Sequence, residues 1–360
     1  MSDLYAGLMS GTSLDGVDAV LADLGGSRPR LVARSHLALE PALRAELLSL
    51  NAPGGNELER AASAGNALAR LYAQAIDALE LHAHGKVRAI GCHGQTIRHR
   101  PVRGYTLQIG NAALLAELTG ITVVADFRSR DVAAGGQGAP LAPAFHAAAF
   151  ASAQEDRVAL NLGGIANISW LPRSGPIAGF DTGPANCLMD LWAERHLGGP
   201  HDKGGAWAAG GSLDPALLTR LLQEPYFAAP PPKSTGRDLF NGAWLEAKLQ
   251  GAEDPRAVQA TLLELTARSI AEAIARHAPG AHRLIACGGG ARNQALMRRL
   301  SALLAPAAVD SSERHGLAPE LVEATAFAWL ARQAMESKPG NLPSVTGARG
   351  TRVLGAIHPA

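Results

Sequence analysis

The stretch Leu4-Tyr-Ala-Gly-Leu-Met-Ser-Gly-Thr-Ser-Leu-Asp-Gly-Val-Asp-Ala-Val-Leu-Ala-Asp-Leu24 decides the fold. Its first residues, Leu4 to Leu8, have the apolar character of a strand, and Ser10 to Gly16 form a tight polar turn. Val17 to Leu24 then alternate partly between apolar and polar residues, which is typical of a second strand. The stretch therefore predicts a hairpin that carries a loop of small residues.

A second unit of this kind lies in the other half of the chain. Strand Val158 to Leu162 is followed by the loop Gly163-Gly-Ile-Ala-Asn167 and strand Ile168 to Leu171. Two such units predict a duplicated α/β architecture with two facing loops. Each loop read alone is also compatible with an ordinary glycine turn.

Both glycine loops are candidates for binding phosphate. Glycine lacks the Cβ that would keep phosphate oxygens away from backbone N–H groups, so Gly11, Gly163 and Gly164 allow close approach. The hydroxyl groups of Thr12 and Ser13 add donors. The P-loop pattern G-x-x-x-x-G-K-[ST] does not occur in the chain, which excludes that kind of phosphate cradle.

The length of 360 residues predicts two domains, because single cores rarely grow beyond about 250 to 300 residues. The glycine-rich stretch Ala133-Ala-Gly-Gly-Gln-Gly-Ala-Pro140 breaks regular structure and is the best boundary candidate. We therefore expect an N-terminal lobe over 1–135 with the first phosphate loop, and a C-terminal lobe over 136–360 with the second. The C-terminal tail is expected to be able to pack back on the N-terminal lobe.

Composition indicates an ordinary soluble globular protein of the cytoplasm. Hydrophobic residues make up 47% and charged residues 18%, so the chain can bury large cores. Lys plus Arg number 33 and Asp plus Glu 32, which predicts no field that would attract nucleic acid or an acidic membrane. Cys92, Cys187 and Cys287 form no metal-binding spacing and are expected to be buried thiols in a reducing compartment. The N-terminus lacks a signal peptide's basic and apolar regions, and no apolar run reaches about 20 residues.

Polar residues that follow strands are candidates for binding a polar substrate, because α/β folds place ligands at the carboxyl ends of strands. Glu323 lies on an apolar helix stripe with Phe327 and Leu330, where its charge needs a partner unless it reaches solvent at the edge of the stripe. The run Asp126 to Asp131 is also compatible with a solvated charged segment. The candidates are Ser10, His93, Gln95, Thr96, Asp126, Arg128, Arg130 and Glu323.

Asp181, in Phe180-Asp-Thr-Gly-Pro-Ala-Asn186, is the candidate general base. It ends a short apolar stretch before a helix whose start Pro184 favours, so a helix-capping role is the alternative. One aspartate facing two phosphate loops is what a kinase needs to accept a proton from its nucleophile.

The turn Gly288-Gly-Gly-Ala-Arg-Asn293 follows a strand and opens a helix, with Asp310 about 20 residues further on, as in a dinucleotide-binding fingerprint. An NAD-dependent oxidoreductase is therefore an alternative. Against it, Asn293 replaces the third glycine or alanine, and no second mononucleotide half follows. Such a turn, with Gly288, Gly289, Gly290 and Asn293, equally lets a nucleoside lie against the backbone. A serine hydrolase is excluded because Asp15 stands where the G-x-S-x-G elbow needs glycine.

Taken together, the motifs resemble those of the anhydro-N-acetylmuramic acid kinase family along the whole chain. Seven blocks occur in the same order, and they are Leu8 to Gly16, Gly91 to Thr96, Val124 to Arg128, Gly135 to Pro140, Gly179 to Pro184, Pro232 to Arg237 and Cys287 to Gly290.

The resemblance implies a two-domain actin-like fold, shared by acetate and sugar kinases, Hsp70 and actin, with a ligand cleft between the lobes. It implies a homodimer that converts 1,6-anhydro-N-acetylmuramic acid, ATP and water into N-acetylmuramic acid 6-phosphate and ADP, in peptidoglycan recycling. Asp181 matches the catalytic base, and the Gly288 turn would hold adenosine. The ATP-binding loop would comprise Gly11, Thr12, Ser13, Leu14, Asp15, Gly16, Val17 and Asp18.

Mg²⁺ is expected with ATP, as in other phosphoryl transfers, without protein ligands that the sequence identifies. Besides the oxidoreductase, a non-enzymatic nucleotide-binding switch of the actin-like fold is the second alternative. Such a switch would differ from a kinase by binding ATP without sugar-dependent release of ADP.

Overall fold

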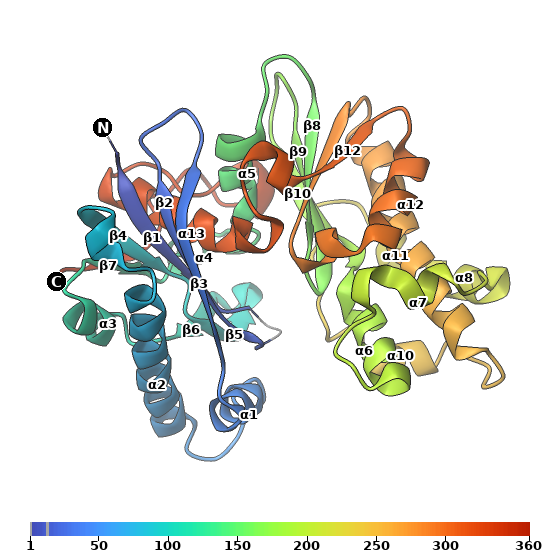
Figure 1. Ribbon diagram of the computed structural model, residues 1–360, viewed down its shortest axis with the longest axis horizontal. Helices are drawn as coiled ribbons and strands as arrows, with labels where there is room; N and C mark the ends of the chain where they lie inside the picture. Colours follow the sequence, from blue (N-terminus) through green and yellow to red (C-terminus); the bar gives the residue numbers. More distant parts are fainter. Residues whose placement is uncertain (1, 12–13) are drawn as a thin grey trace. The chain divides into compact units, whose positions relative to one another are not determined.

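The computed structural model describes residues 2–11 and 14–360 (Figure 1). Thr12 and Ser13 of the expected ATP loop therefore lie outside the described residues. The chain forms two compact units. Unit 1 comprises Met1–Ala149 and Leu321–Ala360, and unit 2 comprises Phe150–Glu320.

Unit 1 is built on a six-stranded sheet of order β13-β7-β4-β1-β2-β3. The strands β1, β2 and β3 are antiparallel neighbours, whereas β4 and β7 run parallel to β1. The strands are β1 Leu4–Met9, β2 Gly16–Asp23, β3 Arg30–Ala38, β4 Val87–Cys92, β7 Val123–Ala125 and β13 Ala356–His358. A separate hairpin joins β5 Gln95–Arg100 to β6 Tyr105–Ile109.

The two faces of this sheet carry separate cores. Leu4, Ala6 and Leu8 of β1 pack in the core that includes Leu68 and Tyr72 of α2, whereas Tyr5 packs in the core that includes α13. This period-two pattern is what a strand covered on both faces requires. The helices are α1 Pro41–Ser49, α2 Glu57–Asp77, α3 Ala112–Thr119, α4 Ser129–Ala133, α5 Ala142–Phe150, α13 Val322–Met335 and α14 Pro343–Thr346.

Helix α13 lies directly on the sheet because two strand residues have no side chain. A Cβ built on Gly7 would lie 2.0 Å from the Ala324 carbonyl oxygen, and one on Gly91 would lie 2.0 Å from the Phe327 carbonyl oxygen. Real Cβ atoms do not approach that closely, so glycine in β1 and β4 sets the depth at which α13 packs. The C-terminal segment is thereby part of unit 1.

Unit 2 is built on a five-stranded sheet of order β10-β9-β8-β11-β12, again with three antiparallel strands followed by two parallel ones. The strands are β8 Arg157–Leu162, β9 Ile165–Leu171, β10 Ala178–Pro184, β11 Arg283–Cys287 and β12 Ala308–Ser311. The helices are α6 Asn186–Leu197, α7 Ala206–Ala209, α8 Pro215–Leu222, α9 Pro225–Ala228, α10 Gly242–Glu246, α11 Pro255–His277 and α12 Gln294–Leu304.

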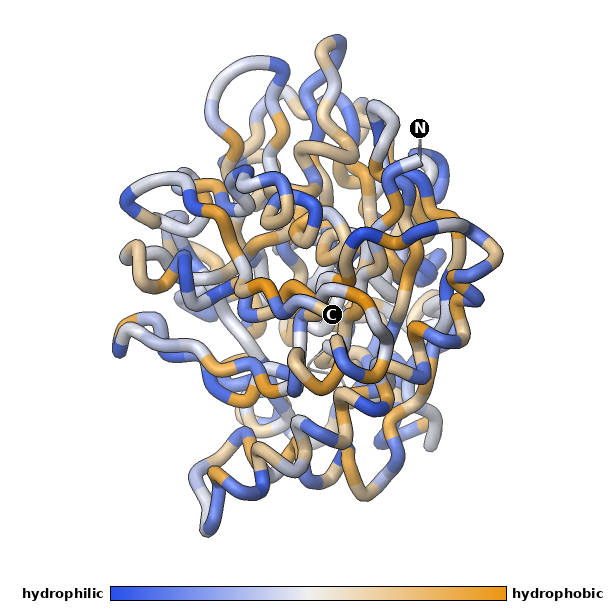
Figure 2. Tube along the Cα trace, turned by 90° about the vertical axis from the view of Figure 1, so that its left-hand side faces the viewer, coloured by the Kyte–Doolittle hydropathy of each residue, from blue (hydrophilic) through white to orange (hydrophobic). Residues whose placement is uncertain are grey.

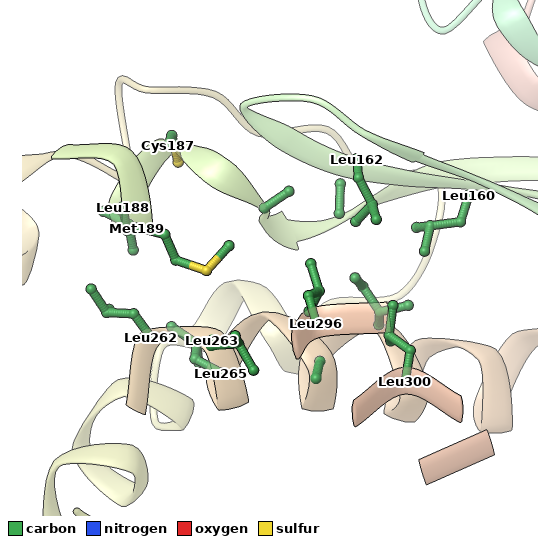
Figure 3. Close-up of a cluster of buried hydrophobic side chains, with 14 of the residues drawn as sticks. Leu160, Leu162, Cys187, Leu188, Met189, Leu262, Leu263, Leu265, Leu296 and Leu300 are labelled. Carbon is green, nitrogen blue, oxygen red and sulfur yellow. The ribbon is translucent and has the colours of Figure 1, made fainter. Parts of the chain in front are cut away.

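One core joins this sheet to its long helices. Leu160 and Leu162 of β8 point toward α11 and α12, as Figure 3 shows, and share a cluster with Leu262 and Leu296. The helices α11 and α12 are further joined by a bidentate ion pair, in which Arg299 donates to both oxygens of Glu264 at 2.6 and 2.7 Å.

The repeated topology identifies the fold class. The first five strands of each main sheet are ordered 3-2-1-4-5 by appearance, with the glycine hairpin as strands 1 and 2, and unit 1 adds β13 at the edge beside β7. This duplication is the two-domain actin-like α/β fold. The predicted fold class is confirmed. Hydrophilic residues interrupt hydrophobic ones along the trace (Figure 2), and no helix among the described residues has the length and apolar character that crossing a membrane requires.

The units are divided at other places than the sequence suggested. The chain passes between them at Ala149–Phe150 and Glu320–Leu321, not at 135/136. The stretch Gly135–Pro140 lies inside unit 1, because the fully buried Asp131 carboxylate accepts hydrogen bonds from Gly138 N–H (2.8 Å), Asn341 Nδ2 (2.6 Å) and the Thr346 hydroxyl (2.8 Å). The glycine-rich loop is hydrogen-bonded to this buried carboxylate and is therefore part of the interior of unit 1. Asp131 is not part of a solvated charged segment.

Gly91→Ala should destabilise the protein by about 1–3 kcal/mol or more, because the new methyl group would overlap the Phe327 carbonyl and force α13 away from the sheet. Urea unfolding measures the change. Gly55→Ala is the matched control, since a Cβ built on Gly55 meets nothing within 4 Å, and its effect should stay within about 0.5 kcal/mol. Equal stability of the two variants would contradict this account of α13 packing.

Candidate active site

Asp181 lies within β10, where hydrogen bonds fix its backbone and one carboxylate oxygen. Its N–H donates to the Lys233 carbonyl oxygen (3.3 Å), and its own carbonyl oxygen accepts the Tyr226 hydroxyl (2.6 Å). The Thr235 backbone N–H donates to Oδ2 (3.1 Å). Among the described residues no hydrogen bond reaches Oδ1, so this oxygen is available to a ligand.

The surroundings of Asp181 raise the pKa of its carboxyl group toward neutral pH. Burial raises the pKa of its carboxyl group to about 6, against the Thr235 N–H and the Lys233 ammonium group, which both favour the anion. Lys233 is itself held in place, because its Nζ donates to the Tyr226 carbonyl oxygen (3.0 Å) and lies 4.6 Å from the centre of the Tyr226 ring. A carboxylate with a pKa near 6 is suited to accept a proton near neutral pH.

The alternative of a helix cap does not describe Asp181. Helix α6 begins at Asn186, its N-cap residue is Ala185, and no side chain caps it. Pro184 is the last residue of β10 and not the first of the helix. Asp181 is therefore free of a role in starting α6.

A bulge follows Asp181 in the strand. The pairing of β10 with β9 shifts register between Asp181 and Gly183. Gly183 has φ +149°, and a Cβ built there would lie 2.6 Å from Cε1 of Phe227. Because bulges redirect side chains next to sites, glycine at 183 lets the strand bend directly after the carboxylate.

The glycine loop of unit 2 contacts the start of α6. The Gly163 carbonyl oxygen accepts the Asn186 N–H (3.1 Å), and the Gly164 carbonyl oxygen accepts the Cys187 N–H (3.1 Å). Nε and Nη2 of the exposed Arg237 lie 3.7 Å from a Cβ built on Gly164. A guanidinium group beside a glycine turn is an arrangement that suits an anion such as phosphate.

The Gly288 turn packs against the same loop region. A Cβ on Gly288 would lie 2.5 Å from Asn161 Oδ1, and one on Gly290 would lie 2.7 Å from Asn186 Oδ1. Gly288 also has φ +79°, so both close contact and conformation demand glycine. Asn293 caps α12 by accepting the Leu296 N–H (3.0 Å). The structure thus brings the Gly163 loop and the Gly288 turn together in unit 2.

The oxidoreductase alternative required Asp310 to bind a ribose. Asp310, on β12, is instead held by two arginines and a histidine. Its carboxylate pairs with Arg283, with Arg314 (3.0 Å) and with His315 (3.4 Å). An acid bound in this way has no free oxygen directed at a dinucleotide.

In unit 1 the loop after β1 is anchored inside the protein. The Ser10 side chain is buried, with Oγ 2.8 Å from the Tyr72 hydroxyl oxygen and donating to the Gly94 carbonyl oxygen (3.2 Å). Leu14 is buried at φ +56°, and its N–H donates to the Gly11 carbonyl oxygen (3.2 Å). Asp15 is exposed.

Strand β2 begins at Gly16, in close contact with β3. A Cβ on Gly16 would lie 2.5 Å from the Leu37 carbonyl oxygen, and Val17 is in the core. Asp18 pairs with His36 Nδ1 at 2.8 Å.

A partly buried group of ionisable residues lies near this loop. Arg128 donates through Nη1 to the Gly138 carbonyl oxygen (2.8 Å), and its Nη2 lies 2.9 Å from His93 Nε2. Burial lowers the pKa of His93 to about 3, with Arg128 acting in the same direction, so His93 is neutral and accepts from Arg128. Burial raises the pKa of Glu323, which Arg128 opposes and Asp18 reinforces. Glu323 is thus a half-buried carboxyl group whose charge is coupled to Arg128.

The remaining candidates of unit 1 differ in exposure. Gln95 is buried and its Oε1 has no hydrogen-bond partner among the described residues, whereas the Thr96 hydroxyl accepts from Gln108 Nε2 (3.1 Å). Asp126 and Arg130 are exposed. The candidates thus fall into one group in each unit.

Sequence reasoning did not assign roles to the residues that hold Asp181. The segment Pro232–Arg237 contains Lys233, Thr235 and Arg237, and it follows a helix and not a strand. The expectation that ligands bind at the carboxyl ends of strands therefore could not identify these residues. The only available signal was that this segment belongs to one of the seven matching blocks.

A duplicated actin-like fold with a glycine hairpin in each unit, and a buried aspartate whose pKa is raised to about 6, is the arrangement expected of a kinase of the actin-like class. The chain belongs to the anhydro-N-acetylmuramic acid kinase family, whose family model matches residues 3–360.

Curated relatives agree with this family. The "Anhydro-N-acetylmuramic acid kinase" of Thiobacillus denitrificans is 57% identical and the alignment covers 99% of this chain and 97% of that protein. The protein of the same name from Variovorax paradoxus is 56% identical, with 99% of each chain covered. Among solved structures, a ROK family glucokinase from Streptomyces griseus in complex with glucose and AMPPNP is 15% identical, with 92% of this chain and 99% of that chain covered and a TM-score of 0.42.

Lys233→Met should raise the pKa of Asp181 further above its value of about 6, because the ammonium group stabilises the carboxylate and its removal leaves burial less opposed. A ¹³C NMR titration of Asp side-chain carboxyl groups measures it, with Asp181→Asn assigning the signal. Lys248→Met is the control, since Lys248 Nζ lies over the Trp244 ring. An unchanged or lowered pKa in Lys233→Met would contradict the assigned electrostatics.

Proposed function

We propose that this protein is an ATP-dependent kinase that hydrolytically opens 1,6-anhydro-N-acetylmuramic acid and phosphorylates O6, giving N-acetylmuramic acid 6-phosphate and ADP. The observation that carries the proposal is Asp181, whose Oδ1 is free of hydrogen bonds while burial holds its pKa near 6. Membership of the family supports the substrate. In the cell the reaction belongs to peptidoglycan recycling and amino-sugar catabolism.

In the proposed reaction Asp181 accepts a proton from water, and the resulting hydroxide attacks C1 of the anhydro sugar. The C1–O6 bond breaks, and its electron pair stays on O6. O6 then attacks the γ-phosphorus of ATP, and ADP leaves. One carboxylate thereby serves both steps, because the released oxygen needs no second base.

The nucleotide is assigned to the glycine loops. In unit 2, Gly163 and Gly164 are proposed to hold phosphate, assisted by Arg237, and the turn Gly288 to Asn293 to hold adenosine. The loop Gly11 to Asp18 in unit 1 is proposed as the ATP-binding loop, as the resemblance implies. Ser10 would act there by holding the loop through Tyr72 and Gly94.

The sugar is assigned to the polar residues of unit 1. Gln95, with its unpaired buried oxygen, and Arg128, a half-buried cation, offer one acceptor and one charge for the amide and carboxylate of the substrate. We assign the surrounding residues to the same site, namely His93, Thr96, Asp126, Arg130 and Glu323.

Mg²⁺ fits the residues only as an ion held mainly by the nucleotide. In 2–11 and 14–360, no group of three or more His, Cys, Asp or Glu residues is placed to hold a metal. Mg²⁺ commonly uses one or two carboxylates together with substrate phosphates. Asp18 and Glu323 are the pair that fits, because the Asp18 charge raises the pKa of Glu323. When bound, the ion would neutralise charge on the β- and γ-phosphates.

We further propose a cytoplasmic homodimer. The buried cysteines Cys92, Cys187 and Cys287 form no disulfide bond, which suits a reducing compartment. The dimer rests on the family resemblance, and sedimentation analysis tests it.

Release of ADP over a panel of amino sugars tests the proposed activity. It should require the anhydro sugar, and reaction in ¹⁸O-labelled water should place the label at C1 of the product, because water opens the bridge. Mass spectrometry locates the label. Label in phosphate alone would mean simple hydrolysis of ATP and would overturn the coupled reaction, and binding of ATP without sugar-dependent ADP would favour the switch.

Asp181→Asn should lower kcat by about 10²- to 10⁴-fold, because the amide cannot accept the proton of water. Sugar affinity and melting temperature should change little, since Asn keeps the size of the side chain. Asp77→Asn, at an exposed position of α2, is the control for loss of a carboxylate. Near-normal turnover of a folded Asp181→Asn protein would refute the role of Asp181.

A further inference from the structure

Three polar side chains form a row across neighbouring strands of unit 2. Asn161 of β8 pairs with Asn167 of β9, and Asn167 pairs with Asp181 of β10. Residues directly opposite in antiparallel strands share one face, with Cβ atoms about 4.5–5.5 Å apart. Leu160 and Leu162 flank Asn161 in β8 and point to the other face, into the core. The row thus places the Asn167 amide beside the Asp181 carboxylate.

Two buried polar atoms beside Asp181 lack partners. They are Oδ1 of Asn167 and Oγ1 of Thr235, and neither has a hydrogen bond among the described residues. The backbone N–H of Thr235 donates to Asp181 Oδ2 at 3.1 Å, so the Thr235 hydroxyl belongs to the immediate surroundings of the carboxylate. A buried polar atom without a hydrogen-bond partner is unfavourable and rare, so two unpaired atoms at one carboxylate point to a ligand.

The hydrogen-bonding capacities of these groups match one small molecule. Asp181 Oδ1 and Asn167 Oδ1 are acceptors, and the Thr235 hydroxyl can donate. A water molecule donates two protons and has two lone pairs. It can donate to both acceptors and accept from Thr235, which leaves one lone pair to attack an electrophile.

We propose that Thr235 and Asn167, together with Asp181, form the binding site of the nucleophilic water and select water over other hydroxyl nucleophiles. This inference rests on the proposed function. An alcohol has only one hydroxyl proton and satisfies only one of the two acceptors, so the other would remain buried and unpaired. In the step itself, water gives one proton to Asp181 Oδ1, its oxygen bonds to C1, and the C1–O6 pair stays on O6 for transfer of the phosphoryl group.

Thr235→Val tests the hydroxyl, because valine keeps the shape and the backbone N–H that binds Asp181. The variant should lose about 10- to 100-fold in kcat, while KM for ATP and the melting temperature stay close to wild type. Thr235→Ser, which restores a hydroxyl group, should recover most of the rate. Thr219→Val is the control, since Thr219 lies on the exposed side of α8 and donates to the Pro215 carbonyl oxygen (2.8 Å).

Competition by methanol tests whether the site selects water as the nucleophile. The ratio of the two products would not change if Asn167 and Thr235 had only a structural role. Wild-type enzyme in aqueous methanol should give free sugar phosphate almost alone. Asn167→Ala, which removes the second acceptor, should give a larger fraction of methyl glycoside phosphate, measured by mass spectrometry as a product ratio. This ratio does not depend on how much of the variant is active.

Two results would overturn the inference: wild-type kcat in a folded Thr235→Val protein, or a wild-type enzyme that accepts methanol in proportion to its concentration. Failure of the proposed function is distinguishable, because the wild-type enzyme would then release no sugar-dependent ADP and place no label from water at C1.

Discussion

The close approach of α13 to β1 and β4 is the contact on which unit 1 depends. Backbone oxygens of α13 occupy the positions that Cβ atoms at Gly7 and Gly91 would take. A helix from the end of the chain is thereby held against the first strand, which carries the first glycine loop. The same helix carries Glu323, whose pKa Arg128 lowers against burial, and places the centre of the Phe327 ring 4.7 Å from that of His93. Glycine in two strands thus decides where a distant carboxylate lies.

In unit 2, glycine residues likewise allow close packing at the loops. Gly288 and Gly290 admit Asn161 and Asn186 at distances that a Cβ would forbid. The adenosine turn proposed above is therefore fixed to the strand that leads into the Gly163 loop. In both units, missing side chains bring together segments that are distant in sequence.

The sequence patterns predicted the elements that are determined by interactions within a few residues. The two glycine hairpins and the strand β11 follow from strand periodicity and glycine conformation, which act over a few residues. Glu323 could not be decided in this way, because its burial depends on α13 reaching the first sheet. The boundary near Pro140 was misplaced for the same reason, since the Asp131 bonds to Asn341 and Thr346 span most of the chain.

The surroundings of Asp181 show why the candidate base could be found and its support could not. A carboxylate after an apolar run is visible in one segment, but its pKa is set by two opposing contributions from elsewhere in the fold. Burial alone would raise the pKa of the carboxyl group further, and a strong ion pair would lower the pKa and make the carboxylate a weak base. Lys233 is turned partly away, because Nζ donates to the carbonyl oxygens of Tyr226 and Phe227. It therefore favours the anion without bonding to it, and the balance leaves the pKa near 6 with Oδ1 unoccupied by the protein.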